Sequence, residues 1–152
     1  MSRIDLSQLL GVASKTEIPA HVAHGGGGAG KMSLGIVNSS KNGKRITFSK
    51  LLAQKVGLTD CAYLALAPSE NYVLIACKAI SENAIECRFS NADENEKKIS
   101  YNANAVYAIT DMFGLNFKKH VSVSYDEVTL DKLDDGTTVA IVKVFNKHPD
   151  AQ

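Results

Sequence analysis

The residues best suited to a binding function are basic and polar side chains gathered around a predicted turn. Lys41, Asn42, Lys44 and Arg45 lie within five residues of one another, and Lys50 follows shortly after them. Lys and Arg side chains can contact phosphate groups, and Arg or Asn can also hydrogen-bond to the edges of bases. Lysines around an Asn-Gly turn are also common as a solvated surface. The cluster by itself leaves both interpretations open.

A glycine-rich run, residues 25–31, resembles the beginning of a phosphate-binding loop. That motif also requires Ser or Thr directly after the lysine, a strand before the run and a helix after it. Met32 occupies the hydroxyl position, and the segment after it has the pattern of a strand. We therefore interpret residues 15–30 as a flexible linker, preceded by a short amphipathic helix over residues 5–12. Together, residues 1–31 form an N-terminal helix and linker in this interpretation.

No group of residues predicts an active site or a metal site. His21 and His24 have the spacing of two metal ligands on a helix, but Pro19 and the glycines that follow argue against a helix there. Ser, His and Asp residues are present without a nucleophile motif that would organise them. We expect a protein that is not an enzyme and that carries no cofactor and no metal.

The aromatic and cysteine residues have the pattern of core residues. The five tyrosines and five phenylalanines fall at predicted strand and helix core positions, so we expect no exposed rings for stacking on single-stranded nucleic acid. Cys61, Cys77 and Cys87 lie in apolar or alternating segments, where cysteine behaves as a small buried hydrophobe. Their odd number favours a reducing compartment.

The same order of elements is predicted twice along the chain after residue 31. Each half has a strand, a turn, a strand, a helix that ends at a Gly-Leu pair, and two further strands. In the first half, Asn42-Gly43 is a strong hairpin signal, and Gly57 has the position of a C-terminal helix cap. The strands are expected at 32–39, 44–48, 61–67, 72–78, 84–90, 97–101, 121–125 and 137–144, and the helices at 49–56 and 103–113. A duplicated unit explains this order best.

The first copy resembles a known family over part of its length. The stretch from Arg45 to Leu58 is similar to the AbrB/MazE (SpoVT-type) swapped-hairpin DNA-binding family. That family has a basic residue, an alternating strand, an amphipathic helix and a Leu-Gly-Ile/Leu ending. The residues in register are Arg45, Ile46, Thr47, Lys50, Val56, Gly57 and Leu58. Ser49 and Ala53 stand where the family usually has proline and arginine. The resemblance covers residues 32–78, and residues 84–144 only by their order of elements.

The resemblance implies both a fold and a function. The fold is α+β and β-rich, with a first repeat at 32–78 and a divergent second repeat at 84–146 in one domain, followed by a tail at 147–152. The two β-β-α-β-β units would interlock as a swapped-hairpin, pseudo-dimeric barrel. The implied partner is double-stranded DNA, and the implied role is transcriptional regulation. The DNA-contacting residues would be Lys41, Asn42, Lys44, Arg45 and Lys50.

The distribution of charge leaves a second hypothesis open. Residues 1–60 contain eight Lys or Arg and three Asp or Glu, whereas residues 61–152 contain nine and thirteen. The protein could instead be an antitoxin-like module, or an inhibitor from a phage or another mobile element, that engages a basic protein partner. The acidic residues concerned are Asp93, Glu94, Glu96, Asp126, Glu127, Asp131, Asp134 and Asp135.

The apolar pattern predicts a protein outside membranes. No apolar run approaches the roughly 20 residues that span a bilayer. The N-terminus has charges inside its apolar pattern and does not have the form of a signal peptide. We expect a cytoplasmic protein, and the sequence leaves its homo-oligomeric state open.

Overall fold

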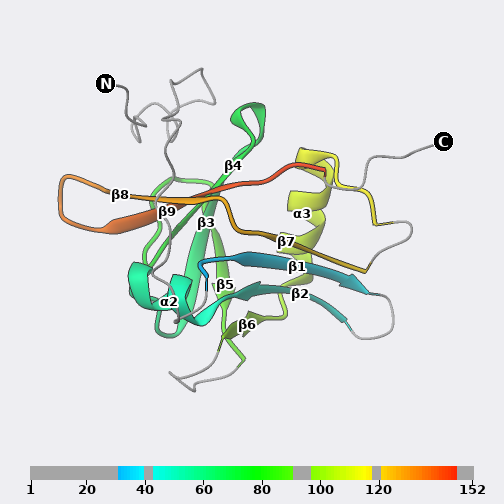
Figure 1. Cartoon of the computed structure of the whole chain (residues 1–152), viewed down its shortest axis with the longest axis horizontal. Coiled ribbons are helices and arrows are strands. Elements are labelled where there is room, and N and C mark those ends of the chain that lie inside the picture. The colour runs from blue at the N-terminus through cyan, green and yellow to red at the C-terminus, as the bar shows by residue number, and fades with distance from the viewer. Residues whose placement is uncertain (1–30, 40–42, 91–96, 118–120, 147–152) are drawn as a thin grey trace.

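The computed structural model describes residues 31–39, 43–90, 97–117 and 121–146. Their elements, in chain order, are β1 (Leu34–Ser39), β2 (Gly43–Phe48), α2 (Lys50–Val56), β3 (Cys61–Ala67), the 3-10 helix η1 (Pro68–Glu70), β4 (Tyr72–Ala76), β5 (Ile85–Arg88), β6 (Lys98–Ser100), α3 (Ala103–Phe113), β7 (Ser122–Tyr125), β8 (Val128–Lys132) and β9 (Thr138–Lys143). The described strands form two antiparallel sheets, of order β6-β2-β1-β7 and β5-β3-β4-β9-β8 (Figure 1). The predicted α+β, strand-rich class is confirmed.

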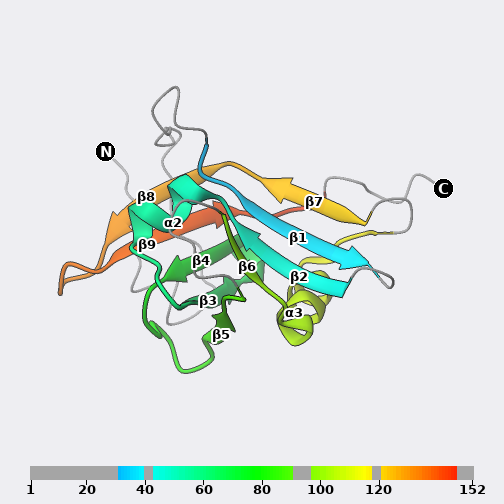
Figure 2. The same ribbon diagram turned by 90° about the horizontal axis from the view of Figure 1, so that it is seen from below.

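The main core lies between the two sheets, as the view from below shows (Figure 2). Because side chains alternate along a strand, every second residue of β1 and β2 enters this core. Leu34, Ile36, Ile46 and Phe48 are fully buried there. They share the core with inward residues of β3, β4 and β9. Helix α3 packs against β1 and β2, and α2 packs against β9.

Both helices begin and end where the sequence predicts them. The Ser49 hydroxyl accepts hydrogen bonds from the backbone N–H of Leu52, at 3.2 Å, and of Ser33, at 2.9 Å. Asn102 caps α3 in the same way through its side-chain oxygen. Gly57 ends α2 in the left-handed conformation, with φ of 80°, which glycine adopts without a steric penalty. These caps fix the directions in which the strands enter and leave each helix.

Each sheet contains strands from both predicted halves of the chain. In the four-stranded sheet, β1 pairs with β7 and β2 pairs with β6. In the five-stranded sheet, β3 pairs with β5 and β4 pairs with β9. Because these ladders join strands that lie far apart in the sequence, the two halves share their sheets and their core.

The predicted barrel is wrong, because neither sheet formed by the described residues closes on itself. At the seam between the sheets, a backbone hydrogen bond joins the segments of β5 and β6, from Ser90 N–H to the Ile99 carbonyl, at 2.8 Å. Further along, the Asn102 amide donates to the Glu86 carbonyl at 2.9 Å as the chain turns into α3. A side-chain hydrogen bond thus also joins the two segments, although β5 and β6 form no ladder.

The sequence analysis did not predict β8. This strand carries Asp131 among its apolar residues and follows Asp126 and Glu127, so its alternation is weak in the sequence. Pairing with β9 organises it, with Val128 opposite Val142 and Lys132 opposite Thr138. The N-terminal helix, the linker and the tail that we predicted lie outside the described residues. No helix among the described residues is long and apolar enough to cross a membrane.

Candidate nucleic-acid interface

A groove of 650 Å³ lies on the outward face of the four-stranded sheet. The register of the ladders builds it, because residues directly opposite each other point to the same face. Gly35 is opposite Thr47 on one side and Ser124 on the other, and Val37 is opposite Arg45 and Ser122. The groove is lined by Ser33, Gly35, Ile36, Val37, Arg45, Thr47, Ser49, Lys50, Lys97, Ser122, Val123 and Ser124.

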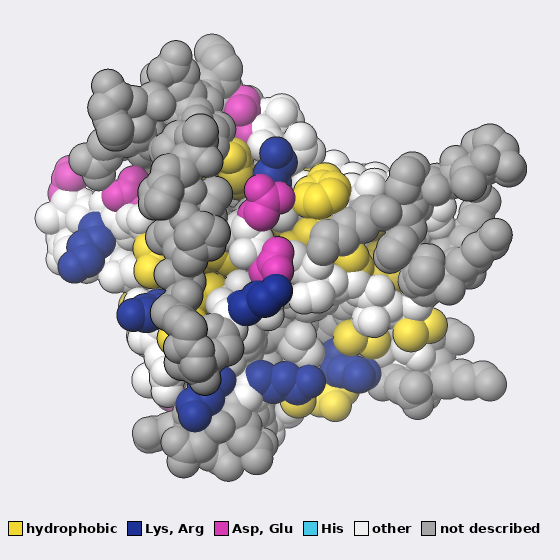
Figure 3. Space-filling model, in the orientation of Figure 1, with side chains coloured by type: hydrophobic (Ala, Val, Ile, Leu, Met, Phe, Trp, Pro, Cys, Tyr) yellow, Lys and Arg dark blue, Asp and Glu magenta, His cyan; other side chains and the backbone are white. Residues whose placement is uncertain are grey.

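The lining of the groove is basic and rich in hydroxyl groups. Arg45, Lys50 and Lys97 supply three positive charges, and the described residues of the lining include no Asp or Glu. In the space-filling view, Lys and Arg side chains gather over the region of β1 and β2, and the acidic side chains in view lie above them (Figure 3). Five Ser or Thr residues complete the lining and could donate hydrogen bonds to phosphate oxygens.

Gly35 keeps the middle of the groove open. A Cβ atom at this position would lie 2.3 Å from the Thr47 Oγ1 atom on the neighbouring strand. Real Cβ atoms essentially never approach another atom so closely, so any side chain here would displace the threonine. The absence of a side chain at position 35 therefore leaves space for the Thr47 hydroxyl on the groove floor.

Buried contacts below the groove hold β7 in place. Tyr125 lies opposite Leu34, and its hydroxyl donates a hydrogen bond to the Phe145 carbonyl at 2.7 Å. Burial raises the pKa of Tyr125 above its usual value, because it disfavours the charged form of the hydroxyl. This anchored residue positions Ser122 and Ser124, which point to the opposite face of the same strand.

The structure brings together only part of the predicted DNA-binding cluster. Arg45 and Lys50 both line the groove. Lys44 precedes Arg45 in β2, so its side chain leaves the opposite face of the sheet, and its Nζ atom lies 5.5 Å from the ring centre of Tyr107 in α3. Lys41 and Asn42 lie outside the described residues.

Sequence reasoning missed Lys97 and the hydroxyl residues of the groove. Lys97 precedes β6, and the pairing of β6 with β2 brings it to the groove from a distant part of the chain. Ser122 and Ser124 did carry a signal, because they alternate with apolar residues in a predicted half-buried strand. That alternation identifies an outward face, but it does not identify which strand lies beside it.

The prediction that the aromatic residues belong to the core is wrong for two tyrosines. Tyr101 is 57% exposed and Tyr107 is 51% exposed. Tyr101 directly follows β6, and the Arg45 guanidinium carbon lies 6.0 Å from its ring centre. Both exposed rings therefore lie beside cations of β2, at distances where the cation is attracted to the ring face.

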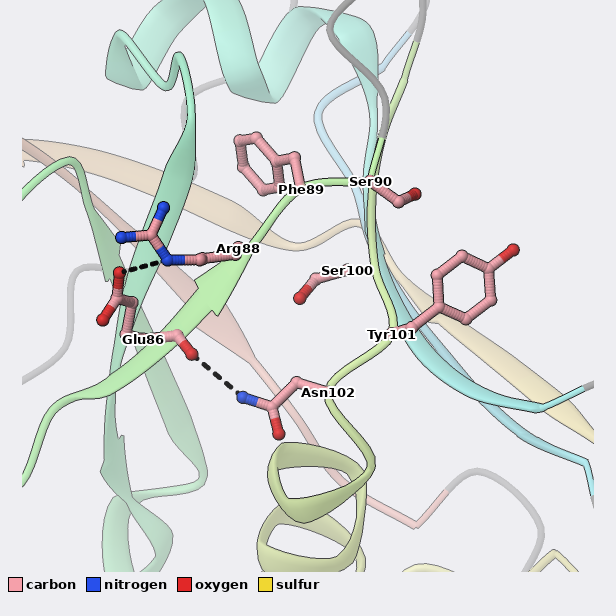
Figure 4. A pocket seen from close by; sticks show the side chains of 7 residues that line it. All are labelled: Glu86, Arg88, Phe89, Ser90, Ser100, Tyr101 and Asn102. Carbon is pink, nitrogen blue, oxygen red and sulfur yellow. Dashed lines mark hydrogen bonds and ion pairs between the residues drawn. The ribbon is translucent and has the colours of Figure 1, made fainter.

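A second cleft, of 390 Å³, lies at the seam between the sheets (Figure 4). Ser100 lines it and is only 1% exposed, and its hydroxyl has no hydrogen-bond partner among the described residues. On the other wall, Arg88 forms an ion pair with Glu86, with 3.2 Å between Nε and Oε2. The lining of this cleft includes one acidic and one basic side chain, whereas that of the groove includes three cations.

The acidic residues of the second hypothesis are partly engaged within the protein. Asp126 pairs with Lys31 at 3.0 Å, and Asp135 pairs with Lys78. The hydrogen bond from Lys78, followed by those from Thr137, holds the pKa of Asp135 well below its usual range. Asp93, Glu94 and Glu96 lie outside the described residues. Binding to a basic protein stays a prediction.

Comparison of this chain with known protein families, with curated proteins and with solved structures finds no match. Among the residues that the structure describes, no group of three or more His, Cys, Asp or Glu side chains is placed to hold a metal ion.

Proposed function

We propose that this protein is a non-enzymatic DNA-binding protein that acts as a transcriptional regulator and resembles the AbrB-like factors. The observation that carries this proposal is the basic, hydroxyl-lined groove on the outward face of the four-stranded sheet. Arg45 and Lys50 are close in the sequence, and the pairing of β6 with β2 adds Lys97 from a distant part of the chain, so the folded sheet concentrates positive charge at the groove. Neutralisation of phosphates by such charges is the dominant source of affinity for DNA.

The two kinds of side chain in the groove have different roles in this proposal. Arg45, Lys50 and Lys97 attract the backbone and bind phosphate oxygens, and the Ser and Thr hydroxyls fix the register by shorter hydrogen bonds. Arg45 can also bind a base edge through two parallel hydrogen bonds. This agrees with the DNA contact that the resemblance to the swapped-hairpin family implies for Arg45. Lys44 belongs to the adjoining hairpin and contributes positive charge from its other face.

The pairing of strands between the two halves supports the likeness to swapped-hairpin regulators. In the ladder β1–β7, the first strand of the first half pairs with the strand that follows the helix of the second half. In the ladder β5–β3, the first strand of the second half pairs with the strand that follows the helix of the first half. The ladder β2–β6 joins the second strands of both halves, with Ile46 opposite Ser100. Exchanging the halves leaves these ladders between the halves unchanged, as expected for two fused copies of an interlocking unit, whereas the ladders β1–β2 and β3–β4 within the first half have no counterpart among the described strands of the second.

The test is binding of a fluorescently labelled, mixed-sequence DNA duplex, measured by anisotropy over a series of salt concentrations. We expect binding that weakens steeply with salt, and a loss of at least about tenfold for Arg45→Glu combined with Lys50→Glu. The slope of log affinity against log salt should fall by about 1 for each phosphate that the variant no longer neutralises. Lys132→Glu combined with Lys143→Glu, two exposed charge reversals in the five-stranded sheet, is the matched control.

The proposal fails if the duplex does not bind at low salt. It also fails if the variant changed at Arg45 and Lys50 binds as well as the control. Circular dichroism and thermal unfolding of both variants show whether they are folded, so that a loss of binding can be assigned to the charges.

A further inference from the structure

An exposed aromatic ring lies beside one of the residues that line the groove. Tyr101 follows Ser100, whose side chain points into the seam between the sheets, and the Tyr101 ring points to the other side of the chain (Figure 4). That side is the outward face, where Arg45 lines the groove. The Arg45 guanidinium carbon lies 6.0 Å from the centre of the Tyr101 ring, so a cation suited to binding phosphate lies beside an exposed ring.

The neighbouring strand leaves the Tyr101 ring uncovered. A Cβ atom at Gly43 would lie 3.8 Å from the ring carbon Cδ1, so a side chain there would extend against the ring. Gly43 has φ of 90°, the left-handed conformation expected beside a hairpin turn, which explains the choice of glycine by its backbone. A consequence of that choice is a tyrosine with more than half of its surface exposed.

We propose that Tyr101 stacks on an unpaired base of DNA whose phosphates lie in the basic groove. This inference rests on the proposed function and specifies its substrate: single-stranded DNA, or a duplex that presents an unpaired base. Bases in an intact duplex are stacked on one another, so an aromatic side chain on a protein surface can stack only on bases that have left the helix. A basic groove next to an aromatic ring is the combination that single strands require.

Charge complementarity favours a nucleic acid over an apolar partner at this position. The ring is flanked by Arg45, and the groove beside it carries three cations and hydroxyl groups rather than a continuous apolar surface. The seam cleft, whose lining also includes Tyr101, is walled by the Glu86–Arg88 ion pair, and such a pair attracts a phosphate backbone less than the three cations of the groove do. The strand of DNA is therefore expected on the groove side of Tyr101.

The absence of tryptophan from the chain makes the stacking directly measurable. Tyrosine emission is then observed without a tryptophan background, and a base stacked on Tyr101 should quench part of it. We expect an unlabelled single-stranded oligothymidine to quench the emission of the full-length protein. Tyr101→Phe keeps the ring, so it should bind this DNA as the wild type does but lose the quenching.

Tyr101→Ala tests the contribution of the ring to affinity. Binding of the same oligothymidine, labelled and measured by anisotropy, should weaken roughly tenfold, since a stacked base contributes about 1–3 kcal/mol. Binding of a fully paired duplex should change less than about twofold. Tyr107→Ala is the matched control, because Tyr107 is as exposed and also has a cation over its ring, but that cation is Lys44 on the other face of β2.

The possible outcomes separate this inference from the proposed function. If Tyr101→Ala and Tyr107→Ala have the same effect, or if oligothymidine binds without quenching, the stacking role is wrong. Duplex binding that still depends on Arg45 and Lys50 would then leave the proposed function in place. If neither form of DNA binds at low salt, both proposals fail.

Discussion

At the scale of single residues, the alternation of a β-strand separates neighbours that look equivalent in the sequence. Lys44 and Arg45 are adjacent cations at the same hairpin, yet Arg45 lines the groove and Lys44 lies over Tyr107 on the other face. Charge is therefore a poor guide to function here without the direction of each side chain. The same holds for Ser100 and Tyr101, of which one is buried and the other is exposed.

Gly35 provides a prediction at this scale. Replacement of a strand glycine by alanine normally stabilises a protein by about 0.5–1 kcal/mol. At Gly35 the added Cβ would lie 2.3 Å from Thr47 Oγ1, so we expect Gly35→Ala to destabilise the fold by about 1 kcal/mol instead. In a Thr47→Ala background, which removes the obstructing hydroxyl, the same change should be stabilising.

Denaturant unfolding of the wild type, the two single variants and the double variant measures this coupling. Equal effects of Gly35→Ala in the two backgrounds would contradict the steric explanation. DNA binding by the same four proteins would show whether the space above Thr47 is used by the ligand.

At the scale of elements, short segments with strong local signals are held by specific caps. Helix α2 has only seven residues, which is too short to be stable by itself in water. It is held by four buried residues and by the Ser49 cap, whose hydroxyl also accepts a hydrogen bond from Ser33 N–H at the start of the neighbouring chain segment. The cap thus joins the helix to the strand that forms the middle of the groove.

Removal of this cap should be costly for so short a helix. We expect Ser49→Ala to lower the free energy of unfolding by about 1–2 kcal/mol, because two backbone N–H groups lose their acceptor. Ser49→Thr keeps the hydroxyl and should restore most of the stability. Chemical denaturation followed by circular dichroism measures both, and equal destabilisation by Ala and Thr would show that the hydroxyl is not what matters.

At the scale of the whole molecule, the shared sheets make the two halves depend on each other. Strands from both halves pair in β1–β7, β3–β5, β2–β6 and β4–β9. Either half by itself would expose the edges and the core face that the other half covers. The pairs of strands that remain within one half would then be isolated two-stranded hairpins, which are only marginally stable in water.

A cut between the halves tests this dependence. A protease site introduced at residues 81–83, in the connection between β4 and β5, should allow cleavage without loss of the fold. We expect the two fragments to remain associated in size-exclusion chromatography, and to unfold together in one transition. Each fragment purified separately should lack stable structure by circular dichroism. Two fragments that separate as folded proteins would show that the halves are independent domains.

The amino-acid sequence by itself determined the elements that depend on local physics. Period-2 alternation and turn residues located nearly every strand, and the helical period with its terminal glycines located α2 and α3, because neighbours along the chain satisfy these preferences. β8 is the exception, since acidic residues interrupt its pattern and only its pairing with β9 organises it.

Only the tertiary structure decided which strands lie side by side, and with them the site. The pairing of β2 with β6 brings Lys97 to the groove, and the pairing of β1 with β7 brings Ser122 and Ser124 there. Tyr101 is left exposed at the end of the same sheet. These placements depend on pairing and packing between distant segments, which no local pattern specifies. The sheets likewise stay open at the seam, where β5 and β6 form no ladder.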